Sequence, residues 1–188
     1  MNRQLILFSA GILTLFALLC CRGWMYRHLI LYHPLRSVSV YKITDPELQK
    51  ELDVQGKEMK DPDIHEIAQQ ALCITAQTLQ YSFEQHASDP NVIFHSHEAH
   101  CIGYAAFFSA ACTALIRQKG LSDEWDVRHY RGKLYLKGVS LHTLFTNSFF
   151  RDHDYVILKN RNTGEQFSVD PVLFEFTWID QIRSLPSP

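Results

Sequence analysis

The residues best suited to chemistry in this chain lie where a histidine-rich loop meets a long apolar run. The stretch HSHEAHCIGYAAFFSAACTALIRQKG, residues 95–120, places Cys101 at that junction. The run after Cys101 is apolar around almost the whole circumference of a helix and ends in basic residues and Gly120, which is typical of a helix terminus. Unpaired backbone N–H groups and the helix dipole stabilise an anion at a helix start. The sequence therefore predicts that the Cys101 thiol ionises readily and acts as a nucleophile.

Two further polar residues fall in a predicted hairpin near the C-terminus. HDYVILK and EQFSVD alternate around NRNTG, which is typical of two antiparallel strands and their turn. If Asn160 pairs with Glu165, His153 and Asp170 share one face and come within side-chain reach. A shift by one residue would break up the apolar face and is therefore disfavoured. That apolar face consists of Val156 opposite Val169 and Leu158 opposite Phe167.

Cys101, His153 and Asp170 have the residue types of a thiol acyl-transfer triad. The cysteine would attack an acyl carbon, the histidine would take and return the proton, and the aspartate would orient the imidazole and stabilise its cation. Each residue taken singly also fits an ordinary structural role, but their order and placement together favour catalysis. His129, within a predicted strand, and His142, near a strand end, are the alternative bases if the hairpin register differs.

The motifs around these residues resemble the transglutaminase-like (papain-like cysteine) superfamily, in the form of a small membrane-anchored bacterial-type member. They are CIGYA at residues 101–105, an aromatic-rich strand region, a histidine that starts a strand, and VDP closing the next strand. The likeness covers about residues 64–178. It implies an α+β fold with a papain-like core, in which the nucleophile-bearing helix packs on an antiparallel β-sheet. It also implies hydrolysis or transamidation of peptide or protein amides.

Two positions depart from the pattern of that superfamily. Asp154 follows the histidine where a small residue is usual, and Val172 follows Asp170-Pro171 where threonine is usual. The superfamily includes inactive members, so a second function stays open: a membrane-tethered domain that binds peptide or cell wall without catalysis. A thiol with a low pKa would favour the enzyme, and an inert thiol would favour the binding module.

The three histidines before the thiol need a separate interpretation. A solvated loop is the simplest one for His95, His97 and His100. Alternatively, His97 or His100 is an auxiliary donor to an oxyanion, whose main donor would be the Cys101 backbone N–H. A metal site is disfavoured, because one loop supplies a poor set of ligands for zinc. The chain also has no D-x-D-x-D run of calcium-site character, so we expect neither metal nor cofactor.

The N-terminal segment is predicted to target a membrane. Residues 5–19, LILFSAGILTLFALL, carry no charge and lie between Arg3 and Arg22. Three interpretations stay open: a retained anchor, a cleaved signal peptide, and a lipoprotein signal with Cys20 as the lipidated residue. The anchor is favoured, because the leucines before Cys20 are not the small residues that a cleavage site needs. We expect an extracytoplasmic domain held at the membrane.

The remaining sequence is divided into a polar lead-in, residues 24–60, and a catalytic domain, residues 61–188, after the N-terminal segment of residues 1–23. In the domain, Asp61-Pro62 predicts the start of a helix that continues to about Phe83. WDVRHY and KLYLKGV predict two short strands joined near Arg131-Gly132. The final SLPSP has no evident role, and the five cysteines are expected to be free thiols.

Composition limits the class of protein and of partner. With 46% hydrophobic and 20% charged residues, the chain has the composition of one globular domain. The net charge of −2 and the lack of a concentrated basic region exclude nucleic acid as a partner. The expected partners are a peptide or protein substrate and a membrane.

Overall fold

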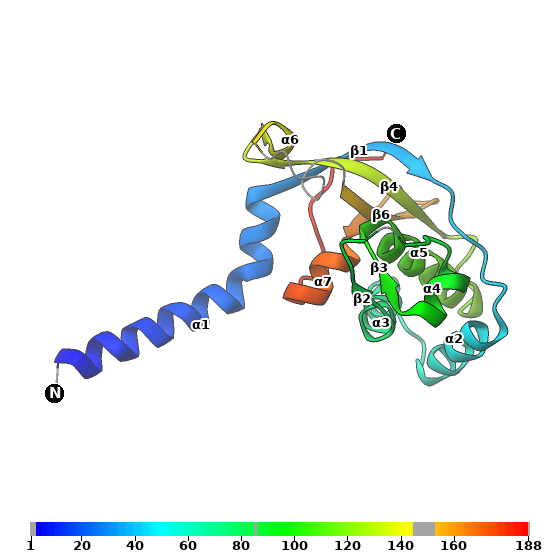
Figure 1. The fold of residues 1–188 in the computed structure, drawn as a ribbon, viewed down its shortest axis with the longest axis horizontal. Coiled ribbons are helices and arrows are strands. Elements are labelled where there is room, and N and C mark those ends of the chain that lie inside the picture. The colour runs from blue at the N-terminus through cyan, green and yellow to red at the C-terminus, as the bar shows by residue number, and fades with distance from the viewer. Residues whose placement is uncertain (1–2, 85, 145–152, 188) are drawn as a thin grey trace.

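The fold is mixed α/β, with helices packed around a five-stranded antiparallel sheet, beside a separate parallel pair of two-residue strands (Figure 1). The computed structural model describes residues 3–84, 86–144 and 153–187. Its helices are α1 (Arg3–Leu29), α2 (Pro46–Glu58), α3 (Ile64–Thr78), α4 (Pro90–Ser96), α5 (Cys101–Gln118), α6 (Leu141–Leu144) and α7 (Pro171–Thr177). Its strands are β1 (Ile30–Val38), β2 (Gln80–Tyr81), β3 (Glu98–Ala99), β4 (Trp125–Leu136), β5 (Val139–Ser140), β6 (His153–Asn160) and β7 (Gln166–Val169).

The main sheet has the strand order β1-β4-β6-β7, with β5 added to the end of β4. Its two edge strands are bridged by the C-terminal segment. The Tyr32 N–H of β1 donates to the Arg183 carbonyl, and the Ile182 N–H donates to the Ser168 carbonyl of β7, each over 2.9 Å. The sheet must therefore curl so that both edges meet one segment. The final SLPSP, for which the sequence suggested no role, takes part in this bridge, because the Leu185 N–H donates to the Tyr32 carbonyl over 2.9 Å.

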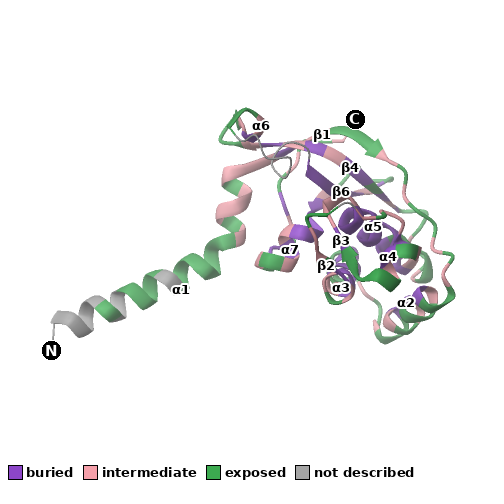
Figure 2. Cartoon of the chain, viewed as in Figure 1, coloured by how far each residue is buried: buried purple, intermediate pink, exposed green. Residues whose placement is uncertain are grey.

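Two apolar cores lie on opposite faces of the sheet. The larger core packs α2, α3 and α5 against one face, and α5 is buried along most of its length (Figure 2). The smaller core fills the inside of the curl and consists of Tyr32, Tyr130, Leu134, Leu141, Tyr155, Ile157 and Ile182. Side chains alternate along β6, so the strand contributes Tyr155 and Ile157 to the small core and Val156 and Leu158 to the large one.

The predicted β6–β7 hairpin is confirmed in type and in register. Val156 lies opposite Val169 and Leu158 lies opposite Phe167, as the apolar face required. The Asn160 N–H donates to the Glu165 carbonyl over 2.7 Å, and this bond closes the turn. Burial of the apolar face against α5 explains why the register could be deduced from the sequence.

The helix that begins at Cys101 is also confirmed. It ends at Gln118, and Gly120 follows with a φ of +73°, the left-handed conformation expected after a helix.

The earlier helix was predicted to start at Asp61-Pro62, and this prediction is wrong. Asp63, and not Asp61, caps α3, because Asp63 and Glu66 form a reciprocal capping box. The helix then ends at Thr78, because the chain turns into strand β2 instead of continuing to Phe83.

The prediction of two short strands joined near Arg131-Gly132 is wrong, because β4 runs unbroken through both residues. Gly132 does not form a turn; its lack of a side chain lets the β1 backbone and the Tyr155 ring pack closely against it. A Cβ at this position would lie 2.5 Å from the His33 carbonyl oxygen and 2.6 Å from Cε1 of Tyr155. The chain turns only after β4, at Lys137 and Gly138, which both have positive φ.

Replacing Gly132 with alanine is expected to lower the free energy of unfolding by about 1–3 kcal/mol, because β1 or the Tyr155 ring must move. Chemical denaturation of the variant would measure the loss. Gly11→Ala is the matched control, because a Cβ at Gly11 meets nothing within 4 Å. Equal stability of both variants would contradict the close packing at Gly132.

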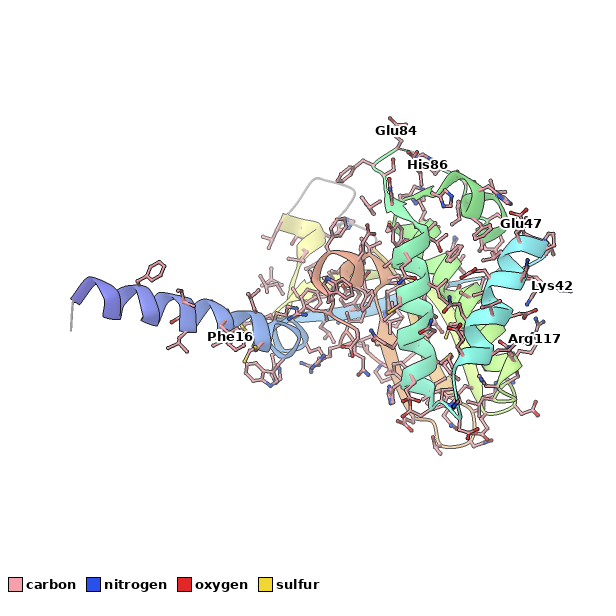
Figure 3. The ribbon with its side chains drawn as sticks, turned by 90° about the horizontal axis from the view of Figure 1, so that it is seen from below. Phe16, Lys42, Glu47, Glu84, His86 and Arg117 are labelled. Atoms are coloured by element: carbon pink, nitrogen blue, oxygen red, sulfur yellow. The ribbon has the colours of Figure 1, made fainter. Side chains whose placement is uncertain are left out.

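The residues assigned to the polar lead-in contribute to the folded body. They supply β1 and helix α2, whose Leu48 and Leu52 are buried in the large core. Helix α1 instead projects away from the body, and Phe16 on it is 65% exposed (Figure 3). Across the described residues, we find no helix with the length and apolar character needed to cross a membrane.

Candidate functional site

Cys101 is the first residue of α5, as predicted. His100 caps the helix: its side-chain Nδ1 accepts the Ile102 N–H over 3.2 Å, and its backbone has an extended conformation. The thiol is only partly buried, whereas the residues that follow it along α5 enter the large core. The helix therefore holds a partly accessible sulfur at the edge of the core.

His153 and Asp170 meet in the predicted pair. Nε2 of His153 lies 2.6 Å from Oδ2 of Asp170, and both side chains are almost completely buried. The Tyr32 hydroxyl donates to the same carboxylate oxygen over 2.7 Å, and the Tyr26 hydroxyl lies 2.7 Å from that of Tyr32. A line of polar groups thus runs from the end of α1 through β1 to the imidazole.

The Asp170 carboxylate is held from two sides. Its other oxygen, Oδ1, accepts the backbone N–H groups of Val172 and Leu173 at the start of α7, over 3.1 and 3.0 Å. Burial raises the pKa of this carboxyl, but His153, the Leu173 N–H and the Tyr32 hydroxyl outweigh burial and hold its pKa below the ordinary value. Asp170 is therefore a charged, fixed partner for His153.

A second histidine–aspartate pair lies on the opposite face of β6. Nε2 of His129 is 2.7 Å from Oδ1 of Asp154, and each side chain is 1% exposed. The second oxygen of Asp154 lies 3.9 Å from the Cys101 sulfur, a weak contact, and also 3.9 Å from Nε of Arg131. His129 and Arg131 project from β4 toward the same carboxylate. The start of β6 and the start of α5 therefore adjoin at Asp154.

The prediction that the Cys101 thiol ionises readily is wrong in direction. Burial, followed by the negative charges of Asp154 and Asp170, raises the pKa of this thiol to about 11. Hydrogen bonds from the backbone N–H groups of Asp154 and Ile102 act in the opposite direction but are outweighed. The helix start alone suggested an anion, whereas the tertiary fold surrounds the sulfur with carboxylates.

The histidines of the preceding loop have separate partners. His95 pairs with Asp45 over 2.8 Å at the surface, and Nδ1 of His97 lies 2.9 Å from the Thr78 carbonyl. His97 also has a positive φ, as the residue that ends α4. His100 caps the helix through Nδ1, which accepts a hydrogen bond, and the role of His97 or His100 as an oxyanion donor stays a prediction.

Of the alternative bases, His129 adjoins the thiol through Asp154, and His142 lies on α6 beside the end of β4.

Sequence reasoning missed Tyr32, although its hydroxyl donates a hydrogen bond to Asp170. Its only signal was a tyrosine within an alternating strand, ILYH, that was assigned to the lead-in. Asp154 did give a signal, as the unusual residue after His153.

An apolar cavity of about 310 Å³ adjoins the buried pair. Its apolar walls come from β1, β4, α6 and α7, and His153 and Asp170 form part of its lining. A larger hollow of about 700 Å³ runs along α3 to Phe167 and Asp180, but none of the three predicted triad residues lines it. We associate the smaller cavity with the site, because its lining includes the pair.

Comparison with known proteins gives no relative for this chain: no family model, curated protein or solved structure matches it. The class of the site therefore has to be argued from its own geometry.

Proposed function

We propose that this protein is a thiol-dependent acyl-transfer enzyme with a transglutaminase-like, papain-like core, acting on peptide or protein amides through Cys101, His153 and Asp170. One observation carries the proposal: the buried 2.6 Å pair of His153 and Asp170 lies at the start of β6, one residue before Asp154, whose carboxylate lies 3.9 Å from the thiol at the start of α5. A nucleophile, a base and an orienting carboxylate on adjoining element starts are the parts that such chemistry requires.

In the proposed reaction, the His153 imidazole takes the thiol proton while Asp170 holds the ring through Nε2. The sulfur attacks the amide carbon, and the carbonyl π electrons move to oxygen. The backbone N–H of Cys101, at the helix start, would stabilise that oxyanion. As the C–N bond breaks, the amine leaves with the proton from His153, and an acyl-thioester remains on Cys101. Water or a second amine then releases the acyl group, by hydrolysis or transamidation respectively.

A protonated resting thiol fits this sequence of steps. Since the pKa of Cys101 is about 11, the proton must leave when the sulfur attacks, so the rate depends on a fixed base. The charged Asp170 supplies that fixation and stabilises the imidazolium that forms. The backbone N–H groups of Asp154 and Ile102, which favour the ionised sulfur, would stabilise the negative charge that it acquires.

A second function, a non-catalytic binding module, is favoured by the raised pKa of the thiol and by the apolar cavity beside His153. An inert cysteine and a hollow with mostly apolar walls are what ligand binding alone would need.

Membrane attachment through residues 1–23 also stays a prediction. The exposed apolar side chains of α1, such as Phe16 and Leu19, support it.

The experiment that tests the enzyme is covalent trapping of an acyl group. The full chain, incubated with a p-nitrophenyl ester as an activated acyl donor, is expected to gain one acyl mass on Cys101, located by peptide mass spectrometry. The Cys101→Ser variant controls for labelling of the other four cysteines, which are all free. A label that is absent from Cys101, or as frequent on Cys73 as on Cys101, would favour the binding module.

A further inference from the structure

The pair formed by His129 and Asp154 has no part in the proposed reaction, yet its two side chains are at least as completely buried as those of His153 and Asp170. Both side chains are 1% exposed, and their 2.7 Å contact joins the middle of β4 to the start of β6. Nδ1 of His129 is buried as well, and within the described residues it has no hydrogen-bond partner. Burying a carboxyl group and an unsatisfied ring nitrogen costs stability, so stabilising the fold does not account for the pair.

The Asp154 carboxylate of this pair faces the Cys101 sulfur. Asp154 uses Oδ1 for His129, so its position is fixed, and Oδ2 is left facing Cys101 at 3.9 Å. The backbone N–H of the same residue also contacts the sulfur. Asp154 therefore touches the thiol with both an acceptor and a donor, at the position where the resembled superfamily usually has a small residue.

We propose that Asp154, braced by His129, is a positioning residue that directs the Cys101 S–H group and holds the thiol protonated in the resting protein. The carboxylate accepts the S–H, and its charge opposes loss of the proton. Cys101 then becomes a nucleophile only when a base takes the proton during attack. The benefit of keeping the thiol protonated rests on the proposed function, whereas the protonation of the thiol can be measured without any substrate.

Titratable and charged groups other than Asp154 also lie around the Cys101 sulfur. Asp170 opposes ionisation as Asp154 does, and Nε of Arg131 lies 3.9 Å from the Asp154 carboxylate. The remaining titratable groups nearby are His153 on β6, His129 on β4, the helix cap His100, and Tyr81 on β2, which interacts electrostatically with Cys101. Among the acidic residues that the structure describes, Asp154 is the one with a hydrogen-bond contact to the sulfur.

The test is the rate of Cys101 alkylation by iodoacetamide as a function of pH, followed by mass spectrometry of the Cys101 peptide in the full chain. Asp154→Asn keeps the shape but removes the charge, and it is expected to raise the rate at pH 8 by about tenfold through a larger thiolate fraction. Asp154→Glu keeps the charge and should stay slow. Asp126→Asn is the matched control, because Asp126 is a β4 aspartate that pairs with Arg128 and Arg161.

His129→Asn separates charge from packing. It removes the brace but leaves the Asp154 charge, so alkylation should remain slow although the variant is less stable. If His129→Asn is as fast as Asp154→Asn, loosened packing explains the rate and the proposal is overturned. An unchanged rate in Asp154→Asn also overturns it. If Asp154→Asn does not fold, the wild-type profile decides, and a midpoint at or below the ordinary thiol value of about 9 overturns the proposal.

Failure of this inference is distinguishable from failure of the proposed function. Faster alkylation of Asp154→Asn without any acyl-Cys101 adduct in the trapping experiment would retain the positioning role and reject the enzyme. An acyl-Cys101 adduct with no effect of Asp154→Asn on alkylation would retain the enzyme and reject the positioning role.

Discussion

Replacing Asp170 with alanine is expected to lower turnover by about 10⁴-fold and the free energy of unfolding by about 3–5 kcal/mol. The carboxylate accepts four hydrogen bonds, from Tyr32, His153, Val172 and Leu173. Its removal leaves the buried His153 without a charged partner and α7 without its cap. Denaturant titration would measure the stability loss, and acyl-enzyme formation would measure the rate.

Asp170→Asn separates the two effects. Asparagine caps a helix about as well as aspartate, so most of the stability should return. The imidazole would still lack a carboxylate to fix its tautomer and stabilise its cation, so turnover should stay low. Recovery of turnover together with stability would show that Asp170 acts only as a helix cap.

The same carboxylate makes an acid-labile contribution to stability. Because the folded pKa of Asp170 lies below its unfolded value, its contribution is complete above about pH 4, the ordinary aspartate value, and is lost as pH falls through the folded pKa. Thermal unfolding of the wild type should therefore lose more stability on acidification than that of Asp170→Asn. Equal acid sensitivity of the two proteins would contradict a lowered pKa.

Replacing His153 with alanine is expected to lower turnover by about 10⁴–10⁶-fold, because a thiol with a pKa of about 11 supplies almost no thiolate at neutral pH without a base. Single-turnover acylation of Cys101 would measure the effect. His95→Ala is the matched control: it removes a histidine that pairs with an aspartate at 2.8 Å, but at the surface. Comparable rates for the two variants would remove His153 from the proposed reaction.

His153→Gln tests whether the loss is chemical. The glutamine amide can still donate to Asp170, so stability should be closer to that of the wild type, while the side chain cannot take a proton at neutral pH. Turnover that returns with stability would mean that His153 only supports the fold around Asp170.

Local pattern was enough to predict the elements that carry the three site residues. Burial of one face determines strand register, so the placement of His153 and Asp170 within side-chain reach followed from periodicity, and the apolar run after Cys101 indicated a helix start there. The capping residue of α3 was missed because Asp61 and Asp63 have the same local chemistry, and only the box with Glu66 distinguishes them.

The tertiary structure alone decided what surrounds the thiol. Local sequence placed Cys101 at the positive end of a helix dipole, but the packing of α5 on β6 buries the sulfur and places Asp154 beside it, and both effects raise the pKa of the thiol. The continuity of β4 through Gly132 and the bridge from the C-terminal segment to Tyr32 are likewise contacts between distant parts of the chain. Hydrophobic periodicity reports which face of an element is buried, and it carries no information about which distant charge is buried with it.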